Sequence, residues 1–100
     1  MTVARIELAP EVSEDFDLIF DHLAEHDLQH ATARIGEIIQ ALNVLESNPA
    51  IGRPAATGKR ELVIGREARG YVALYRYLPE LDTVFVLAIL SQREAGYRRQ

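Results

Sequence analysis

Residues 71–90 read YVALYRYLPELDTVFVLAIL, and this stretch decides the fold. Within 71–78, one alternate set of side chains is Tyr, Ala, Tyr, Tyr and the other is Val, Leu, Arg, Leu, which is the period of a β-strand. Residues 83–90 are almost wholly apolar, as expected for a strand inside a sheet that is covered on both faces. Pro79 to Asp82 supply turn residues between them, so the stretch predicts a β-hairpin.

Upstream of this hairpin, the pattern predicts a short strand over 61–64 and a loop rich in Pro, Gly and Ala over 49–59. Two amphipathic helices come before the loop, because apolar residues at 12, 16, 19, 20 and 23 and at 31, 35, 38, 42 and 45 recur at helical spacing. We expect the first helix from Pro10 to His26 and the second from Leu28 to Ser47, with Asp27 as the cap of the second.

Residues 3–8 alternate apolar and polar side chains and predict one more strand at the start of the chain. The order is therefore strand, helix, helix and three strands, which is typical of an α+β domain. We expect an N-terminal strand and an antiparallel helical hairpin packed on a mainly antiparallel sheet that three C-terminal strands complete. A length of 100 residues suits a single domain over 1–100.

Composition narrows the class of protein. The absence of cysteine excludes disulfides and thiolate metal sites and suits a reducing compartment. No signal-peptide pattern is visible, and the apolar run over 84–90 is too short to span a bilayer, so we expect a cytoplasmic protein without a membrane partner.

Charge is distributed unevenly along the chain. Residues 1–52 carry a net charge of −8 and residues 53–100 carry +4, within a total of −4. This asymmetry indicates either an acidic face opposite a basic one or two halves that are simply solvated.

Few residues suggest catalytic or metal chemistry. His22, His26 and His30 are four apart, but Asp27 is expected to break the helix between them, so ordinary surface histidines are the better interpretation. No Ser/His/Asp or Cys/His nucleophile system is discernible, and we expect no metal and no cofactor. In the loop, Arg53 is expected to pin the backbone to an acid.

Arginine and tyrosine gather in the second half of the chain. A guanidinium binds phosphate and a tyrosine ring stacks on a base, but the same residues are common in protein interfaces and in half-buried sheets, and all three readings stay open. The set comprises Arg60, Arg66, Arg69, Tyr71, Tyr75, Arg76 and Tyr77. Arg93 and Tyr97 follow the last strand, where residues at a sheet's end often carry function.

The order of these motifs resembles the RelE/ParE toxins over nearly the whole chain. The resemblance rests on the helical hairpin ending in LESNP (45–49), on IGR (51–53) and REL (60–62), on GYVALYRY (70–77), and on the last strand leading into QREAGY (92–97). It implies the toxin half of a bacterial type II toxin–antitoxin pair and the α+β fold described above. It also implies a cognate antitoxin with a segment that folds on binding, and contact with operator DNA only through that antitoxin.

The resemblance implies two alternative activities. RelE-like toxins cleave mRNA in the ribosome, which would give Arg69, Arg76, Arg93 and Tyr97 catalytic roles, whereas ParE-like toxins inhibit DNA gyrase. The ParE branch is favoured because Ser91 stands where relatives often carry histidine and because the pI of about 5.3 disfavours binding to ribosomal RNA. The third alternative is an inactive binding module with the toxin fold. Candidate contacts with the target or the antitoxin are Arg53, Arg60, Arg69, Tyr75, Arg76, Arg93 and Tyr97.

Overall fold

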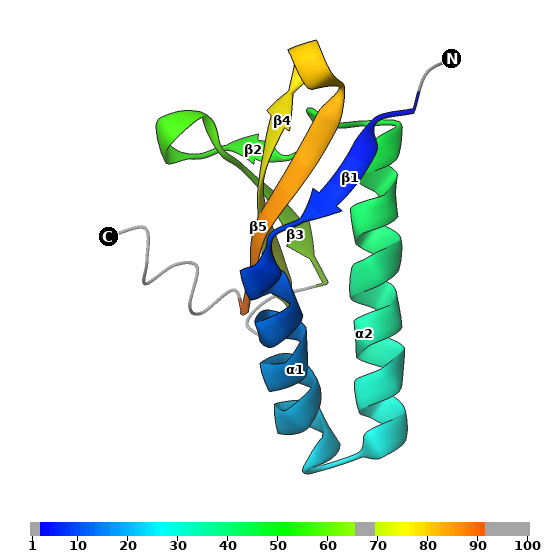
Figure 1. The fold of residues 1–100 in the computed structure, drawn as a ribbon. Coiled ribbons are helices and arrows are strands. Elements are labelled where there is room, and N and C mark those ends of the chain that lie inside the picture. The colour runs from blue at the N-terminus through cyan, green and yellow to red at the C-terminus, as the bar shows by residue number, and fades with distance from the viewer. Residues whose placement is uncertain (1–2, 66–69, 92–100) are drawn as a thin grey trace.

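The computed structural model describes residues 3–65 and 70–91, which form two helices against one sheet (Figure 1). The helices are α1 (Pro10–Ala24) and α2 (Leu28–Asn43). The strands are β1 (Arg5–Leu8), β2 (Arg53–Pro54), β3 (Arg60–Ile64), β4 (Tyr71–Leu78) and β5 (Thr83–Ser91). Three short 3-10 turns lie between them, namely η1 (Val44–Glu46), η2 (Ala56–Gly58) and η4 (Pro79–Leu81).

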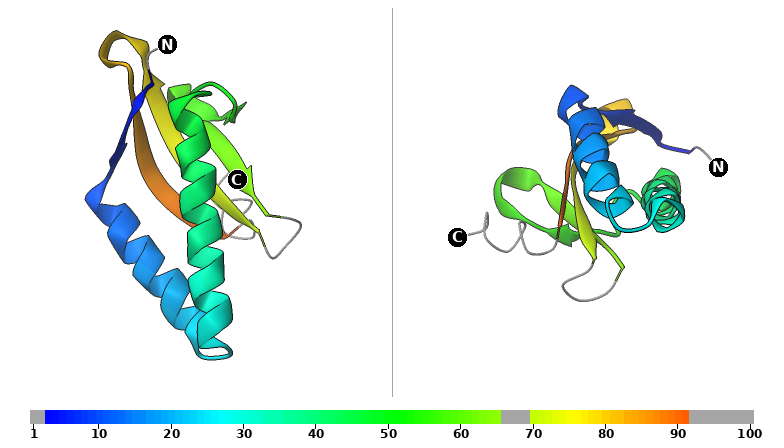
Figure 2. Two further views of the ribbon diagram at one scale, coloured as in Figure 1. Left: turned by 90° about the vertical axis from the view of Figure 1, so that its right-hand side faces the viewer. Right: turned by 90° about the horizontal axis from the view of Figure 1, so that it is seen from below.

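The sheet has the strand order β1-β5-β4-β3-β2. β1 runs parallel to β5, and the other neighbours are antiparallel, so the predicted α+β fold with a mainly antiparallel sheet is confirmed. Both helices lie on the same face of the sheet (Figure 2). The opposite face, called the open face below, carries the side chains of β4 that alternate with the buried tyrosine and alanine.

One strand and several boundaries differ from the sequence-based expectation. β1 begins at Arg5 rather than at residue 3, β3 begins at Arg60 rather than at residue 61, and β5 ends at Ser91 rather than at residue 90. A fourth strand, β2, follows the helices, and it escaped prediction because it consists of Arg53 and Pro54 only, and proline lacks the N–H that would extend a ladder. The first helix ends at Ala24 rather than His26. The second ends at Asn43 and tightens into η1 before Ser47. The predicted cap is confirmed, since the Asp27 carboxylate accepts hydrogen bonds from two backbone N–H groups of the first turn of α2.

A bulge in β5 explains its continuous apolar sequence. Leu74 pairs with Ala88 and Tyr75 pairs with Val86, so Leu87 is an additional residue on the β5 side. The bulge changes which alternate residues of β5 face the helices. Val86 faces the helices before the bulge, and Ile89 faces them after it. Leu90 instead packs with Val72 in a second, smaller cluster on the open face. Apolar residues at successive positions therefore serve two faces. The expected central place of β5 in the sheet is confirmed, whereas the helices cover only one of its two faces.

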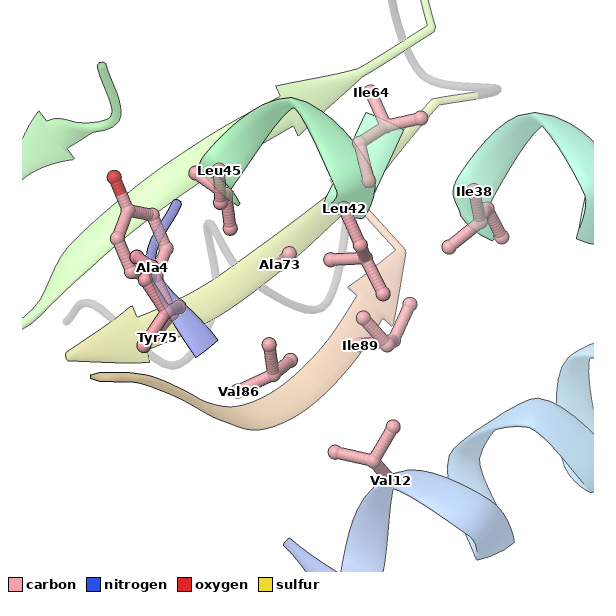
Figure 3. Close-up of a cluster of buried hydrophobic side chains, with 11 residues drawn as sticks. Ala4, Val12, Ile38, Leu42, Leu45, Ile64, Ala73, Tyr75, Val86 and Ile89 are labelled. Atoms are coloured by element: carbon pink, nitrogen blue, oxygen red, sulfur yellow. The ribbon is translucent and has the colours of Figure 1, made fainter. Parts of the chain in front are cut away.

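The main core lies between the helices and the sheet. It joins Val12 of α1, Ile38 and Leu42 of α2, Leu45 of η1 and Ala73 of β4 to side chains of β1, β3 and β5 (Figure 3). Val12 and Leu45 are fully buried, which follows from the helical stripes seen in the sequence.

Asp15 fastens α1 to the bulged part of β5. Its carboxylate Oδ2 accepts a 2.9 Å hydrogen bond from the backbone N–H of Ile89, which lies beyond the last β5 residue paired with β1, Val86. None of the helices within residues 3–65 and 70–91 is long and apolar enough to cross a membrane.

Candidate partner-binding surface

Tyr75 lies in the core rather than on the surface, and this corrects its expected place among exposed contact residues. Its side chain is fully buried, as Figure 3 shows among the core residues. The hydroxyl accepts a 2.8 Å bond from the Gly52 N–H and donates a 2.8 Å bond to the Pro49 carbonyl. Burial raises the pKa of Tyr75 above its ordinary value, although the Gly52 bond and the charge of Arg60 oppose that shift. Tyr75 therefore fixes the loop 49–59 to the core side of β4 through two hydrogen bonds to its backbone.

Gly52 is required by space rather than by a left-handed backbone. A Cβ at this position would lie 2.6 Å from the Tyr75 hydroxyl oxygen and 2.9 Å from the Glu61 carbonyl oxygen. Its φ is not positive, whereas those of Gly58 and Gly65 are. The glycine therefore permits a close approach of the loop to β3 and β4.

Arg60 and Arg53 both help to hold this loop, but on opposite faces of the sheet. Arg60 shares a register position with Tyr75, and its guanidinium donates a 2.8 Å bond to the Gly52 carbonyl. Arg53 pairs with Glu61 across the β2–β3 ladder, and its Nε donates to the Glu61 carboxylate at 3.1 Å. The expectation that Arg53 pins the loop to an acid is thus confirmed. The Glu61 side chain is 5% exposed and that of Arg53 is 52% exposed, so Arg53 keeps a solvent-facing surface.

Arg76 also reaches the loop from the open face. Its Nη2 donates a 2.8 Å bond to the carbonyl of Thr57, a residue held at φ 59° in η2. Its Nε is buried and has no hydrogen-bond partner within the described residues. Arg53 and Arg76 thus flank the buried Glu61 on the open face, whereas Arg60 and Tyr75 act on the helix side.

The remaining candidates, Arg69, Arg93 and Tyr97, lie outside the described residues, as does Arg66. The structure brings four of the seven candidates around one loop, 49–59. All four are bonded to the loop or hold it to the sheet, namely Tyr75, Arg60, Arg53 and Arg76.

The acidic half of the chain forms an exposed helical surface. Four of the five carboxylates on α1 are solvent-exposed, namely Glu11, Glu14, Asp17 and Asp21; the fifth, Asp15, is half-buried and bonded to β5. Four basic residues of the second half of the chain lie instead on β2, β3, β4 and the loop between β2 and β3, namely Arg53, Lys59, Arg60 and Arg76. His22 and His26 make an edge-to-face ring contact near the tip of the helical hairpin, and no group of three metal-ligating side chains occurs in the described ranges.

Comparison with known proteins decides the family. Residues 6–96 match the family model for the ParE toxin of the type II toxin–antitoxin system parDE. The chain belongs to the ParE toxin family. No curated protein matches by sequence.

Solved structures share the fold of this ParE-family chain at low sequence identity. The chromosomal ParDE toxin–antitoxin system of P. aeruginosa matches with a TM-score of 0.76 and 22% identity, over 89% of this chain and 96% of that one. The E. coli toxin RelE, a mutant in the free state, matches with a TM-score of 0.66 and 12% identity, over 97% and 93%. The toxin–antitoxin complex RelBE2 of Mycobacterium tuberculosis matches with a TM-score of 0.59 and 18% identity, over 90% and 99%. These likenesses confirm the RelE/ParE fold.

Two residues that shape this surface of the ParE-family chain were not singled out in the sequence. Glu61 gave no signal because a single glutamate before an apolar pair resembles any strand start, and only the β2–β3 register reveals its arginine partner. Thr57 contributes through its backbone carbonyl, which no side-chain pattern can report.

Proposed function

We propose that this ParE-family chain is the toxin of a type II pair, that a cognate antitoxin neutralises it, and that it inhibits DNA gyrase by protein–protein contact. The family match over residues 6–96 supports the assignment as a toxin. The observation that carries the choice of target is that three groups from the arginine and tyrosine set, Tyr75, Arg60 and Arg76, bond to the backbone of the chain's own loop.

A nuclease site needs donors and acid–base groups that reach the substrate. The Tyr75 hydroxyl is buried and already makes two hydrogen bonds. Arg60 donates to Gly52, and Arg53 is paired with Glu61. These groups stabilise the loop, and the exposed part of Arg53 together with Arg76 suits contact with a protein carboxylate.

An antitoxin partner is supported by what the similar structures contain. The P. aeruginosa structure is of a ParDE toxin–antitoxin system, and the M. tuberculosis structure is of a toxin–antitoxin complex. We propose that Arg53 and Arg76 contact the target or the antitoxin directly and that Arg60 and Tyr75 act by holding the loop. Arg69, Arg93 and Tyr97 stay proposed contacts at positions outside the described residues.

The test is tightly induced expression without antitoxin, read by a DNA-damage reporter and by bulk protein synthesis in the same culture. We expect early damage signalling while translation continues. Purified toxin should also inhibit supercoiling by gyrase, and R53A with R76A should weaken that inhibition more than R5A, a matched exposed arginine on β1. Unimpaired supercoiling at high toxin concentration would refute the gyrase proposal.

The same experiment separates the alternatives. An immediate stop of translation without damage signalling would instead indicate a ribosome-dependent mRNA endonuclease that uses Arg69, Arg76, Arg93 and Tyr97. In that case R93A and Y97F should abolish toxicity. Unchanged growth with normal amounts of soluble protein would indicate an inactive binding module.

A further inference from the structure

The last part of β5 has a neighbouring strand on one side only. β4 pairs with β5 as far as Ser91, whereas β1 pairs with it only as far as Val86. Backbone contact on the β1 side ends where the Ala9 N–H donates a 2.9 Å bond to the Val86 carbonyl. Within residues 3–65 and 70–91, no strand lies beside residues 87–91 on that side, so another element has to satisfy the backbone groups that point there.

A bulge makes this part of β5 more dependent on a second support. Leu87 is the additional residue, and a bulge bends its strand and interrupts the regular ladder. The register with β4 fixes where each residue lies along the ladder. It does not fix the twist of the strand end, because the twist between neighbouring strands ranges over roughly 10–35°. The direction in which β5 ends therefore depends on an attachment on its β1 side.

Asp15 of α1 supplies that attachment. Its Oδ2 accepts the 2.9 Å bond from the Ile89 N–H, two residues beyond the bulge. α1 lies against β5 in this region, and Val12, three residues before Asp15, packs in the same core cluster as Ile89 (Figure 3). The bond to a carboxylate is charge-assisted, and its half-buried place reduces competition from water. Asp15 therefore fastens the end of β5 to a helix that the core already holds.

The neighbouring carboxylates of α1 lie differently. Glu14 and Asp17 are exposed to solvent, whereas Asp15 is half-buried. Asp15 lies beside the apolar stripe of the helix, three residues after Val12 and four before Ile19, both of which pack in the core. Its carboxylate is thus on the side of α1 that faces the sheet, where it serves the backbone of β5 rather than solubility.

The direction of β5 matters because of the residues that continue from it. Arg93 and Tyr97, which the proposed function names as contacts, follow Ile89 by four and eight residues in the chain. They lie outside the described residues, and the described strand leads directly to them. Four residues span at most about 14 Å, so a rotation of about 10° at Ile89 displaces the chain four residues later by up to roughly 2 Å. Such a displacement is large compared with the tolerance of a hydrogen bond.

We propose that Asp15 is a positioning residue of the toxin. It holds the end of β5, and with it the start of residues 92–97, in the orientation in which Arg93 and Tyr97 meet the target. It acts through the Ile89 backbone and does not touch the target itself. This inference rests on the proposed function, because that proposal names Arg93 and Tyr97 as contacts.

A second aspartate provides a matched control. Asp27 also accepts backbone N–H bonds, and the hairpin tip where α2 begins lies away from the sheet (Figure 1). D15A and D27A each remove one negative charge and one carboxylate acceptor, so a thermal melt should show a lowered Tm for both.

The purified variants are assayed for inhibition of gyrase supercoiling at a temperature at which each is folded. We expect D15A to raise the inhibitory concentration at least about tenfold and D27A no more than about threefold. D15N, which keeps an acceptor oxygen, should also stay within about threefold of the unmodified protein. Equal losses in D15A and D27A would overturn the inference, because they would indicate a purely structural role.

A double-mutant cycle with R93A tests whether Asp15 acts through the residues after β5. Once Arg93 is removed, its position no longer matters, so D15A should cost no more than about threefold in the R93A background. D27A and R93A should instead show the product of their single effects. A D15A loss that is undiminished by R93A would overturn the inference. Should D15A fail to fold, D15E replaces it, because it keeps the charge and moves the acceptor by one methylene. We expect D15E to lose at least about threefold, and full inhibition would overturn the inference.

Growth arrest on induced expression separates failure of this inference from failure of the proposed function. Growth arrest does not depend on which target is hit. Unmodified protein that arrests growth without inhibiting gyrase refutes the proposed target, and a comparison of D15A with D27A in the growth assay still decides the inference. Unmodified protein that neither arrests growth nor inhibits gyrase refutes both.

Discussion

Replacing Tyr75 with phenylalanine removes one oxygen atom from the core and both of the bonds that it makes to the loop. The hydroxyl accepts from the Gly52 N–H and donates to the Pro49 carbonyl, each at 2.8 Å. Gly52 is buried, and so is the tyrosine itself. The substitution therefore leaves the Gly52 N–H without its acceptor in a place from which water is largely excluded.

The expected loss follows from this geometry. An unsatisfied buried donor costs about 1–3 kcal/mol, whereas the shape of the phenyl ring is kept and creates almost no cavity. A domain of this size loses about 4–8 °C of melting temperature per kcal/mol, so a loss of about 2 kcal/mol lowers the Tm by roughly 8–16 °C.

Thermal and urea unfolding measure this loss against a matched tyrosine. Tyr77 lies on the same strand, and its hydroxyl donates to the Asp82 carboxylate at 2.9 Å in a partly exposed position, where water can replace it. We expect Y77F to shift the Tm by less than half as much as Y75F. A Y75F variant that melts within about 2 °C of the unmodified protein, or no earlier than Y77F, would refute the reasoning.

Three further predictions concern stability. G52A should lower the free energy of unfolding by about 1–3 kcal/mol because its Cβ would meet the Tyr75 hydroxyl at 2.6 Å. G36A on α2, where no atom lies within 4 Å of the new Cβ, should raise it by about 0.5–1 kcal/mol. Urea titration of both variants checks this contrast. D15A should cost about 1–2 kcal/mol and speed exchange of the Ile89 amide, while D15N, which retains an acceptor oxygen, should lose less. Burial raises the pKa of Tyr75, so the unfolded chain loses the phenol proton at a lower pH than the folded protein does. The stability that the protonated hydroxyl contributes is therefore complete below about pH 10 and is lost as pH rises through the folded-state pKa. In urea titrations at alkaline pH, Y75F should lose less unfolding free energy with rising pH than the unmodified protein; an equal fall of stability with pH in the two proteins would contradict this.

Most of the fold could be predicted because its signals are local. The apolar stripes of the two helices, the Asp27 cap and the alternation over 71–78 depend on residues within a few positions of one another, and the structure confirms each. The alternation also grouped Tyr75 with Ala73 on one face of the strand. It could not say which face the helices would cover, because that depends on contacts between distant segments. Tyr75 was therefore named as a candidate contact, with a half-buried place in the sheet left open, and the structure buries it fully.

The site was less predictable because its interactions are distant in sequence or involve the backbone. Asp15 and Ile89 are 74 residues apart, and the hydrogen bond uses a main-chain N–H that any residue would offer. Glu61 acquires its role from the register of a two-residue strand. An arginine in a sequence suggests a phosphate or carboxylate ligand, but only the structure shows that Arg60 is bonded to a carbonyl of its own loop.

The parallel pairing of β1 with β5 also bears on the timing of synthesis. Arg5 lies opposite Thr83, and the strand that β1 needs is made after almost all the rest of the domain. At about 5–20 residues per second, this leaves β1 without its neighbour for roughly 4–16 s after it has been synthesised. Contacts of such high sequence separation also slow folding itself. During that interval a nascent chain exposes both edges of β1 and the apolar face of the helical hairpin, so translation that halts before residue 83 leaves a fragment prone to aggregate rather than a partly active toxin.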